Sequence, residues 1–195
     1  MLAITAITTR AQDNDLVIAE DATNQIAYAT FKTDKNGNRI SNSYSGDVVI
    51  PEKSPSGYPV TGINHHTFEG CVNLKSVKIP GTVKFIDHDA FRKSSLTEIT
   101  CLATVPPACG NSGVFYHVNK EQCKLLVPEG SIDAYKAAEV WKEFFNIEPT
   151  GINRVEADAS AAGWYSINGQ RSSSARKGLN IMRTADGKTR KVIIR

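Results

Sequence analysis

Three histidines and one cysteine are the residues of this 195-residue chain whose side chains could bind a metal or start a reaction. His65 and His88 are 23 residues apart, and Asp87 and Asp89 flank the second histidine. Imidazole nitrogens and carboxylate oxygens are ordinary zinc ligands, so a fold that stacked the two histidines would offer a metal site. The alternative is a solvated polar turn. We predict the turn, with no metal or other cofactor, and keep His65 and His88 as the weaker metal candidate.

Cys71 invites a second chemical interpretation, as a thiol nucleophile with His65 or His66 as its base. Such a pair needs an orienting group and an oxyanion hole, and the sequence supplies no recognisable candidate for either. It also contains no phosphate-binding loop, HExxH or GxSxG motif. We therefore predict that the chain is not an enzyme, and a metal-dependent or thiol enzyme remains the remote alternative.

A repeated apolar pattern would position these side chains. The segments 60–79 and 83–101 carry apolar residues at matching places, 22 or 23 residues apart. The spacing L-x-x-V-x-I puts three side chains on the inner face of one short strand. An Ile and a Phe ahead of them would point inward from the return path, so that stacked coils bury the whole set. The matched pairs are Val60 and Val83, Ile63 and Ile86, Phe68 and Phe91, Leu74 and Leu96, Val77 and Ile99, and Ile79 and Cys101.

The strand element occurs twice more, as VVIP at 48–51 and LLVP at 125–128. Two complete coils and two partial ones follow from this count. The segment 110–122 is then the longest interruption between strands, and its Tyr116 and His117 are candidates for ligand contact because long loops on rigid scaffolds often carry function. The predicted parallel strands lie near 47–50, 74–79, 96–101 and 123–127.

The ends of the repeat look like caps, which a solenoid requires. Alternating residues at 26–31 and a turn at Asn36-Gly37 indicate an antiparallel β cap. Ser131 is a suitable N-cap for a helix over about 132–143.

The chain divides into five predicted parts. They are a truncated signal-peptide remnant at 1–11, a β cap with the first strand at 12–58, the repeats with their capping helix at 59–149, a linker at 150–163, and a small β domain at 164–195. The last domain has predicted turns at Asn168-Gly169 and Asp186-Gly187.

Charge and cysteine content narrow the class of protein. The formal net charge is +3, and residues 171–195 hold eight Lys or Arg and one Asp but no aromatic residue. Without aromatic side chains for stacking on bases, this segment favours a solvated basic hairpin over a nucleic-acid partner. No run approaches the roughly 20 apolar residues of a membrane span. The four cysteines form no CxxC pair and allow three full disulfide pairings, although free buried thiols are favoured for Cys71 and Cys101.

The repeat resembles the BspA-like leucine-rich repeat, which reads roughly I-x-x-x-A-F-x-x-C-x-x-L-x-x-I-x-I-P. The second unit departs from it, with Ser near the Cys position and no Pro after Cys101. VPPACG (105–110) and the segment 125–147 resemble a terminal element of such surface proteins, and WYSINGQR with the following hairpin resembles their C-terminal sorting-like domain. The matching residues of the first unit are Ile63, Phe68, Cys71, Leu74, Val77, Ile79 and Pro80.

This resemblance implies a β-rich leucine-rich-repeat solenoid with a short parallel sheet and one C-terminal capping helix, between the N-terminal β cap and a C-terminal all-β domain. It also implies export by a Gram-negative gut or oral bacterium, with residues 164–195 addressing type IX secretion machinery in the outer membrane. We therefore predict a secreted or cell-surface protein that adheres to a host or matrix protein or a glycan. An inert scaffold or accessory envelope protein is the alternative. The candidate binding residues on the outward strand face are Lys75, Ser76, Lys78, Thr97, Glu98 and Thr100.

Overall fold

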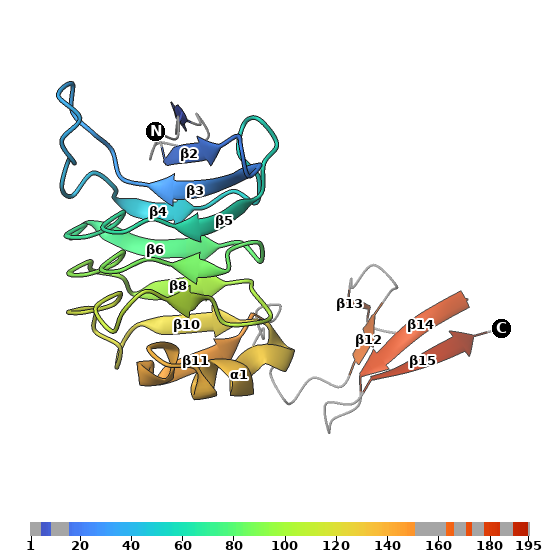
Figure 1. The fold of residues 1–195 in the computed structure, drawn as a ribbon. Helices are drawn as coiled ribbons and strands as arrows, with labels where there is room; N and C mark the ends of the chain where they lie inside the picture. The colour runs from blue at the N-terminus through green and yellow to red at the C-terminus, as the bar shows by residue number, and fades with distance from the viewer. Residues whose placement is uncertain are drawn as a thin grey trace. The chain divides into compact units, whose positions relative to one another are not determined.

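The computed structural model describes residues 5–8, 16–150 and four strands between residues 163 and 194. The chain divides into two compact units, Met1–Gly151 and Ile152–Arg195 (Figure 1). The first unit is a stack of coils in which two sheets run along the same series of turns. Of the predicted signal remnant at 1–11, only the strand Thr5–Thr8 lies within the described residues, and the linker prediction falls almost wholly outside them.

A five-stranded, wholly parallel sheet forms one wall of the solenoid, in the order β11-β10-β8-β6-β4. Its strands are adjacent rungs of the ladder in Figure 1. Four of them coincide with the predicted parallel strands, and the fifth, β11, was not predicted. The strands are β4 (Gly46–Val49), β6 (Leu74–Ile79), β8 (Glu98–Cys101), β10 (Lys124–Val127) and β11 (Asn146–Pro149).

A six-stranded sheet forms another wall, in the order β1-β2-β3-β5-β7-β9. The first three strands pair antiparallel, and β3, β5, β7 and β9 then pair in parallel. Ile63 and Ile86 point inward from the return path as expected, at most 1% exposed, and the return path forms this second sheet, which the sequence did not predict. Its strands are β1 (Thr5–Thr8), β2 (Val17–Asp21), β3 (Ile26–Thr30), β5 (Val60–Ile63), β7 (Phe85–Ile86) and β9 (Ala108–Cys109).

Inward side chains of stacked coils form continuous columns. Val77 lies opposite Ile99 in the five-stranded sheet, and both are at most 1% exposed. In the turns between the two sheets, the rings of Phe68 and Phe91 stack at 5.0 Å, and those of Phe91 and Phe115 stack at 5.3 Å. Burial of each such ring contributes about 1.5–3 kcal/mol, and one coil alone could not supply it. The predicted inward set is confirmed.

A third complete coil runs through the segment that we interpreted as a loop insertion. Cys109 stands opposite Ile86, and Phe115 continues the aromatic column. The Lys93 amide donates to the Tyr116 carbonyl at 2.8 Å, so this turn stacks on the one before it. The sequence hid this coil because a Cys replaces the Ile and one extra residue separates it from the Phe.

The C-terminal end of the solenoid is closed by short helical turns, and the predicted helix over 132–143 was too long. Helix α1 covers Ile132–Ala137, between the 3₁₀ turns η1 (Glu129–Ser131) and η2 (Trp141–Glu143). Ser131 makes no side-chain capping bond. The extended backbone of Ala138 ends helix α1, and Val140 adopts a positive φ of 69° just before η2, after which the chain returns as β11. The rings of Trp141 and Phe144 cover Phe115 at 5.2 and 5.1 Å, whereas Phe145 is 75% exposed.

The second unit contains one antiparallel sheet, in the order β13-β12-β14-β15. The turns predicted at Asn168-Gly169 and Asp186-Gly187 lie outside the described residues. No helix in the described part of either unit is long and apolar enough to cross a membrane. The strands are β12 (Gly163–Tyr165), β13 (Arg171–Ser172), β14 (Gly178–Arg183) and β15 (Thr189–Ile194).

Candidate binding surfaces

The outward residues of β6 and β8 form the ladders that the repeat predicted. Ser76 lies opposite Glu98, and Lys78 lies opposite Thr100. One step earlier, the Thr97 amide donates to the Lys75 carbonyl at 2.9 Å. We call this surface the strand face, and it consists of Lys75, Ser76, Lys78, Thr97, Glu98 and Thr100.

The strand face continues onto the neighbouring strands. The Ser76 hydroxyl donates to the Asp47 carboxylate of β4 at 2.7 Å, and Lys124 of β10 lies opposite Glu98. Val49, 52% exposed, lies opposite Lys78. The sequence missed these neighbours because β4 and β6 pair across a register shift, which no repeat alignment reveals.

The lysines of the strand face are exposed and form no ion pair with any residue that the structure describes. Their backbone is fixed between two hydrogen-bonded strands. Because little backbone entropy remains to be lost, a partner that met these ammonium groups would bind a surface that is already ordered.

Tyr116 and His117 lie in the turn of the third coil rather than in a free loop. Their rings meet edge to face at 4.2 Å, and the Arg92 guanidinium lies 5.7 Å from the Tyr116 ring centre. Tyr116 is 51% exposed. Among the described residues, no hydrogen bond, ion pair or ring contact joins this pair to the strand face, so the predicted binding residues divide into two separate surfaces.

The predicted equivalence of His65 and His88 is confirmed, since their rings stack at 5.0 Å with an angle of 4°. Both share one carboxylate: the His88 Nδ1 lies 2.9 Å and the His65 Nδ1 3.7 Å from oxygens of Asp87. Burial raises the pKa of Asp87, but hydrogen bonds from His88 and the charges of both imidazoles outweigh it, so that the pKa falls. Among the described residues no group of three or more His, Cys, Asp or Glu is placed to hold a metal.

His66 belongs to a different cluster. Its Nδ1 lies 3.0 Å from the Glu69 carboxylate, which Arg39 approaches at 2.9 Å from the preceding coil. His66 and its repeat equivalent Asp89 both adopt a left-handed backbone with φ of 54°. The cluster therefore orders the turn between the sheets.

The cysteines are free thiols in apolar surroundings. Cys71 is 1% exposed, and burial raises the pKa of its thiol. Burial also raises the pKa of Cys109 and of Cys123 to about 12. A thiol is nucleophilic as its thiolate, so these surroundings suit packing rather than attack on a substrate.

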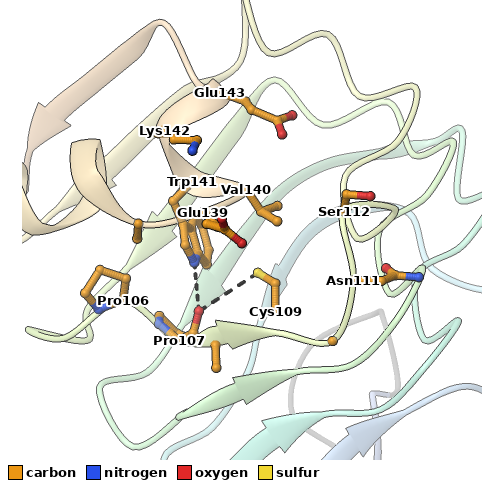
Figure 2. Close-up of a pocket in the computed structure, with 13 residues that line it drawn as sticks. Pro106, Pro107, Cys109, Asn111, Ser112, Glu139, Val140, Trp141, Lys142 and Glu143 are labelled. Carbon is orange, nitrogen blue, oxygen red and sulfur yellow. Dashed lines mark hydrogen bonds between the residues drawn. The ribbon is translucent and has the colours of Figure 1, made fainter.

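A pocket of about 620 Å³ is the feature that sequence reasoning missed. Figure 2 shows it between β9 and the turn that carries Trp141. The Trp141 Nε1 donates to the Pro107 carbonyl at 2.8 Å, and the indole itself is fully buried. The unusual Pro106-Pro107 pair was the available signal, because proline cannot donate a ladder hydrogen bond.

Stacked coils that build one wholly parallel sheet, one partly parallel sheet and one aromatic column define a β solenoid of the repeat-protein class. Residues 48–126 match the family described as the BspA type leucine-rich repeat region, in six copies. This match agrees with the resemblance to the BspA-like repeat that the sequence indicated.

Among solved structures, the chain is similar to a leucine-rich repeat protein from Bacteroides capillosus. The two are 18% identical, with a TM-score of 0.37, and the match covers 72% of this chain and 98% of the other. No curated protein matches the chain significantly.

Proposed function

We propose that this protein is a non-catalytic binding protein of the cell surface or the secreted fraction, and that the strand face is its contact surface. The observation that carries the proposal is the register of β6 on β8, which holds polar side chains in fixed ladders. Repeat proteins commonly use such regular surfaces for binding partners.

The charge of the surface suggests the chemistry of the partner. Lys75 and Lys78 project from the same strand, and Lys124 extends the basic character onto β10. Acidic groups on a host or matrix protein, or on a glycan, would complement these ammonium groups. Exposed Val49 beside Lys78 adds an apolar contact of the kind that protein partners use.

Export belongs to the same proposal. BspA-type repeats are typical of surface and secreted proteins, and residues 1–11 would be the remnant of a signal peptide. The antiparallel sheet of residues 164–195 would address the outer-membrane secretion machinery, and the antiparallel strands at the N-terminus would cap the repeats. Detection of the full-length protein in the cytoplasm of its native cell, with residues 1–11 still attached, would contradict this part.

Charge reversal on the strand face tests the binding proposal. An array of immobilised matrix proteins and glycans is probed with the wild type, with the double variant Lys75→Glu/Lys78→Glu, and with the control Lys35→Glu/Lys136→Glu. The control reverses two exposed lysines outside the strand face. We expect the first double variant to lose at least about tenfold in affinity at an unchanged Tm, because two favourable contacts become repulsive.

An inert scaffold predicts a different result. In that case both double variants behave like the wild type on every immobilised probe. Equal loss in both variants would also contradict the proposal, because it would show attraction to net charge rather than to the strand face.

A further inference from the structure

The two sheets end at different coils at the C-terminal side of the solenoid. Beyond β10, the five-stranded sheet gains β11, but the six-stranded sheet stops at β9. The chain that would have supplied its next strand forms α1 and η2 instead. Strand β9 is therefore an edge strand, and among the described residues only β7 pairs with it.

Hydrogen bonding shows which groups of β9 face outward from this edge. The amides of Ala108 and Gly110 donate to carbonyls of the β7 coil, at 2.9 and 2.8 Å. Since alternate residues of a strand face opposite sides, the N–H and C=O of Cys109 point away from β7. Ile86 is the equivalent residue one coil earlier, and its carbonyl accepts a hydrogen bond from the Gly110 amide. The same groups of Cys109 have no backbone partner in the described part of the chain.

The Trp141 side chain lies where the next strand of the six-stranded sheet would begin. Its indole N–H donates to the Pro107 carbonyl, as the Ala108 amide donates to Lys84 one coil earlier. A side chain thus satisfies one acceptor of the edge. The next donor and acceptor, both on Cys109, open into the pocket that Figure 2 shows beside Trp141.

The pocket suits a single extended chain. The β9 segment lines one side of it, and residues 138–143 line the other. The inward column of Ile63, Ile86 and Cys109 stops here, so an apolar side chain of a bound strand would continue it. The charged residues of the lining are Glu139, Lys142 and Glu143, and Glu143 is already paired with Lys120 at 2.6 Å. The charges of Glu139 and Lys142 then balance each other, which leaves backbone bonding and apolar contact as the determinants of binding.

We propose that the β9 edge binds an extended peptide segment of a partner protein, parallel to β9, with a small or medium apolar side chain against Cys109. The peptide carbonyl accepts from the Cys109 amide, and a peptide amide two residues later donates to the Cys109 carbonyl. This is strand addition to an exposed sheet edge. The proposed peptide site contains no residue of the strand face, so its test is independent of the proposed function.

A peptide that copies residues 82–88, TVKFIDH, is a suitable probe, because this segment already pairs in parallel with β9 at its other edge. The full chain, labelled with ¹⁵N, is titrated with this peptide and with a scrambled version as the control. We expect saturable shifts of the Cys109 and Asn111 amides and of the Trp141 indole N–H, while Lys75 and Lys78 stay unchanged. The exchange rate of the Cys109 amide with solvent should fall at least about tenfold in the bound state.

Cys109→Pro removes the open amide without breaking a backbone bond to β7, although it also replaces the thiol side chain, and it should weaken peptide binding at least about tenfold. The wild-type exchange measurement keeps the test valid if this variant does not fold. Equal binding of the scrambled peptide, shifts confined to the strand face, or no shift at β9 at saturation would overturn the proposal. Protection of Cys109 that rises with protein concentration alone would assign the edge to a second copy and would also overturn it.

Discussion

The two sheets of the solenoid share one core but differ in how they meet their surroundings. The five-stranded sheet has strands of four to six residues and gains β11 at its C-terminal end. In the six-stranded sheet, β7 and β9 are only two residues long, and nothing described pairs beyond β9. One sheet therefore covers β10 with a further strand, whereas the other leaves one side of β9 without a paired strand among the described residues.

The outward residues of the two sheets also differ in chemistry. Across the six-stranded sheet the outward residues are Tyr28, Gly62, Phe85 and Ala108, in register. A Cβ on Gly62 would lie 3.0 Å from the Tyr28 ring, so this surface is covered by its own aromatic side chain. The strand face has no such cover. Repeated coils thus produce two chemically distinct walls from one backbone pattern.

The largest expected effect is a loss of stability, and it should differ between the shared core and the outward ladders. Phe91→Ala should lower the free energy of unfolding by about 3–5 kcal/mol, because Phe91 is fully buried between Phe68 and Phe115. Phe85→Ala removes the same side chain from a position that is 41% exposed, and should cost less than about 1 kcal/mol. Chemical denaturation of both variants measures the difference. Equal losses would show that the aromatic column does not dominate the core.

A smaller effect is expected where the six-stranded sheet stops. Trp141→Phe keeps a ring in the core but leaves the Pro107 carbonyl without its indole donor, at a cost of about 1–2 kcal/mol. Chemical denaturation followed by circular dichroism gives the value. An unchanged stability would mean that the indole hydrogen bond does not close this end of the sheet.

The turns between the two sheets allow a matched pair of substitutions with opposite signs. Gly70, Lys93 and His117 occupy equivalent places in successive coils, and all have a positive φ between 56° and 70°. Lys93→Gly should stabilise the fold by about 0.5–1 kcal/mol, and Gly70→Ala should destabilise it by a similar amount, about 1 kcal/mol. No atom lies within 4 Å of a Cβ at Gly70, so backbone conformation alone accounts for the cost. The same sign in both variants would contradict this explanation.

The smallest effect concerns the Asp87 carboxylate beneath the stacked histidines. The folded state holds its pKa below the unfolded value of about 3.9, so the unfolded state binds more protons between these two values. Its contribution to stability is present above about pH 4 and is lost as the pH falls through the folded pKa. Asp87→Asn should therefore flatten the dependence of unfolding free energy on pH in this acidic range. His88→Gln, which keeps the backbone donor, should flatten it only in part.

The sequence predicted what the repeat period dictates. Inward residues such as Leu74, Val77 and Ile79, and the stacking of His65 on His88, follow from spacing alone. The third coil was missed because Cys109 and one extra residue break the pattern, although the coil geometry survives.

The closed end of the solenoid was also beyond a repeat argument. Ala138 ends helix α1, and the chain then turns through η2, with Trp141 and Phe144 buried, so that β11 can pair with β10. The pocket beside β9 follows from that turn. Periodicity describes the interior of a solenoid, whereas its ends depend on contacts that no period encodes.

Amide hydrogen exchange across the two sheets tests the central contrast most directly. Thr150 donates to the Val127 carbonyl at 2.6 Å, so by alternation the Leu125 amide also faces β11, whereas the Cys109 amide faces the pocket. In the free protein we expect Cys109 to exchange at least about tenfold faster than Leu125, Ala108 or Gly110. Protection of Cys109 equal to that of Leu125 would show that the edge of β9 is already paired, and would contradict the contrast between β10, which β11 covers, and β9, which no described strand covers.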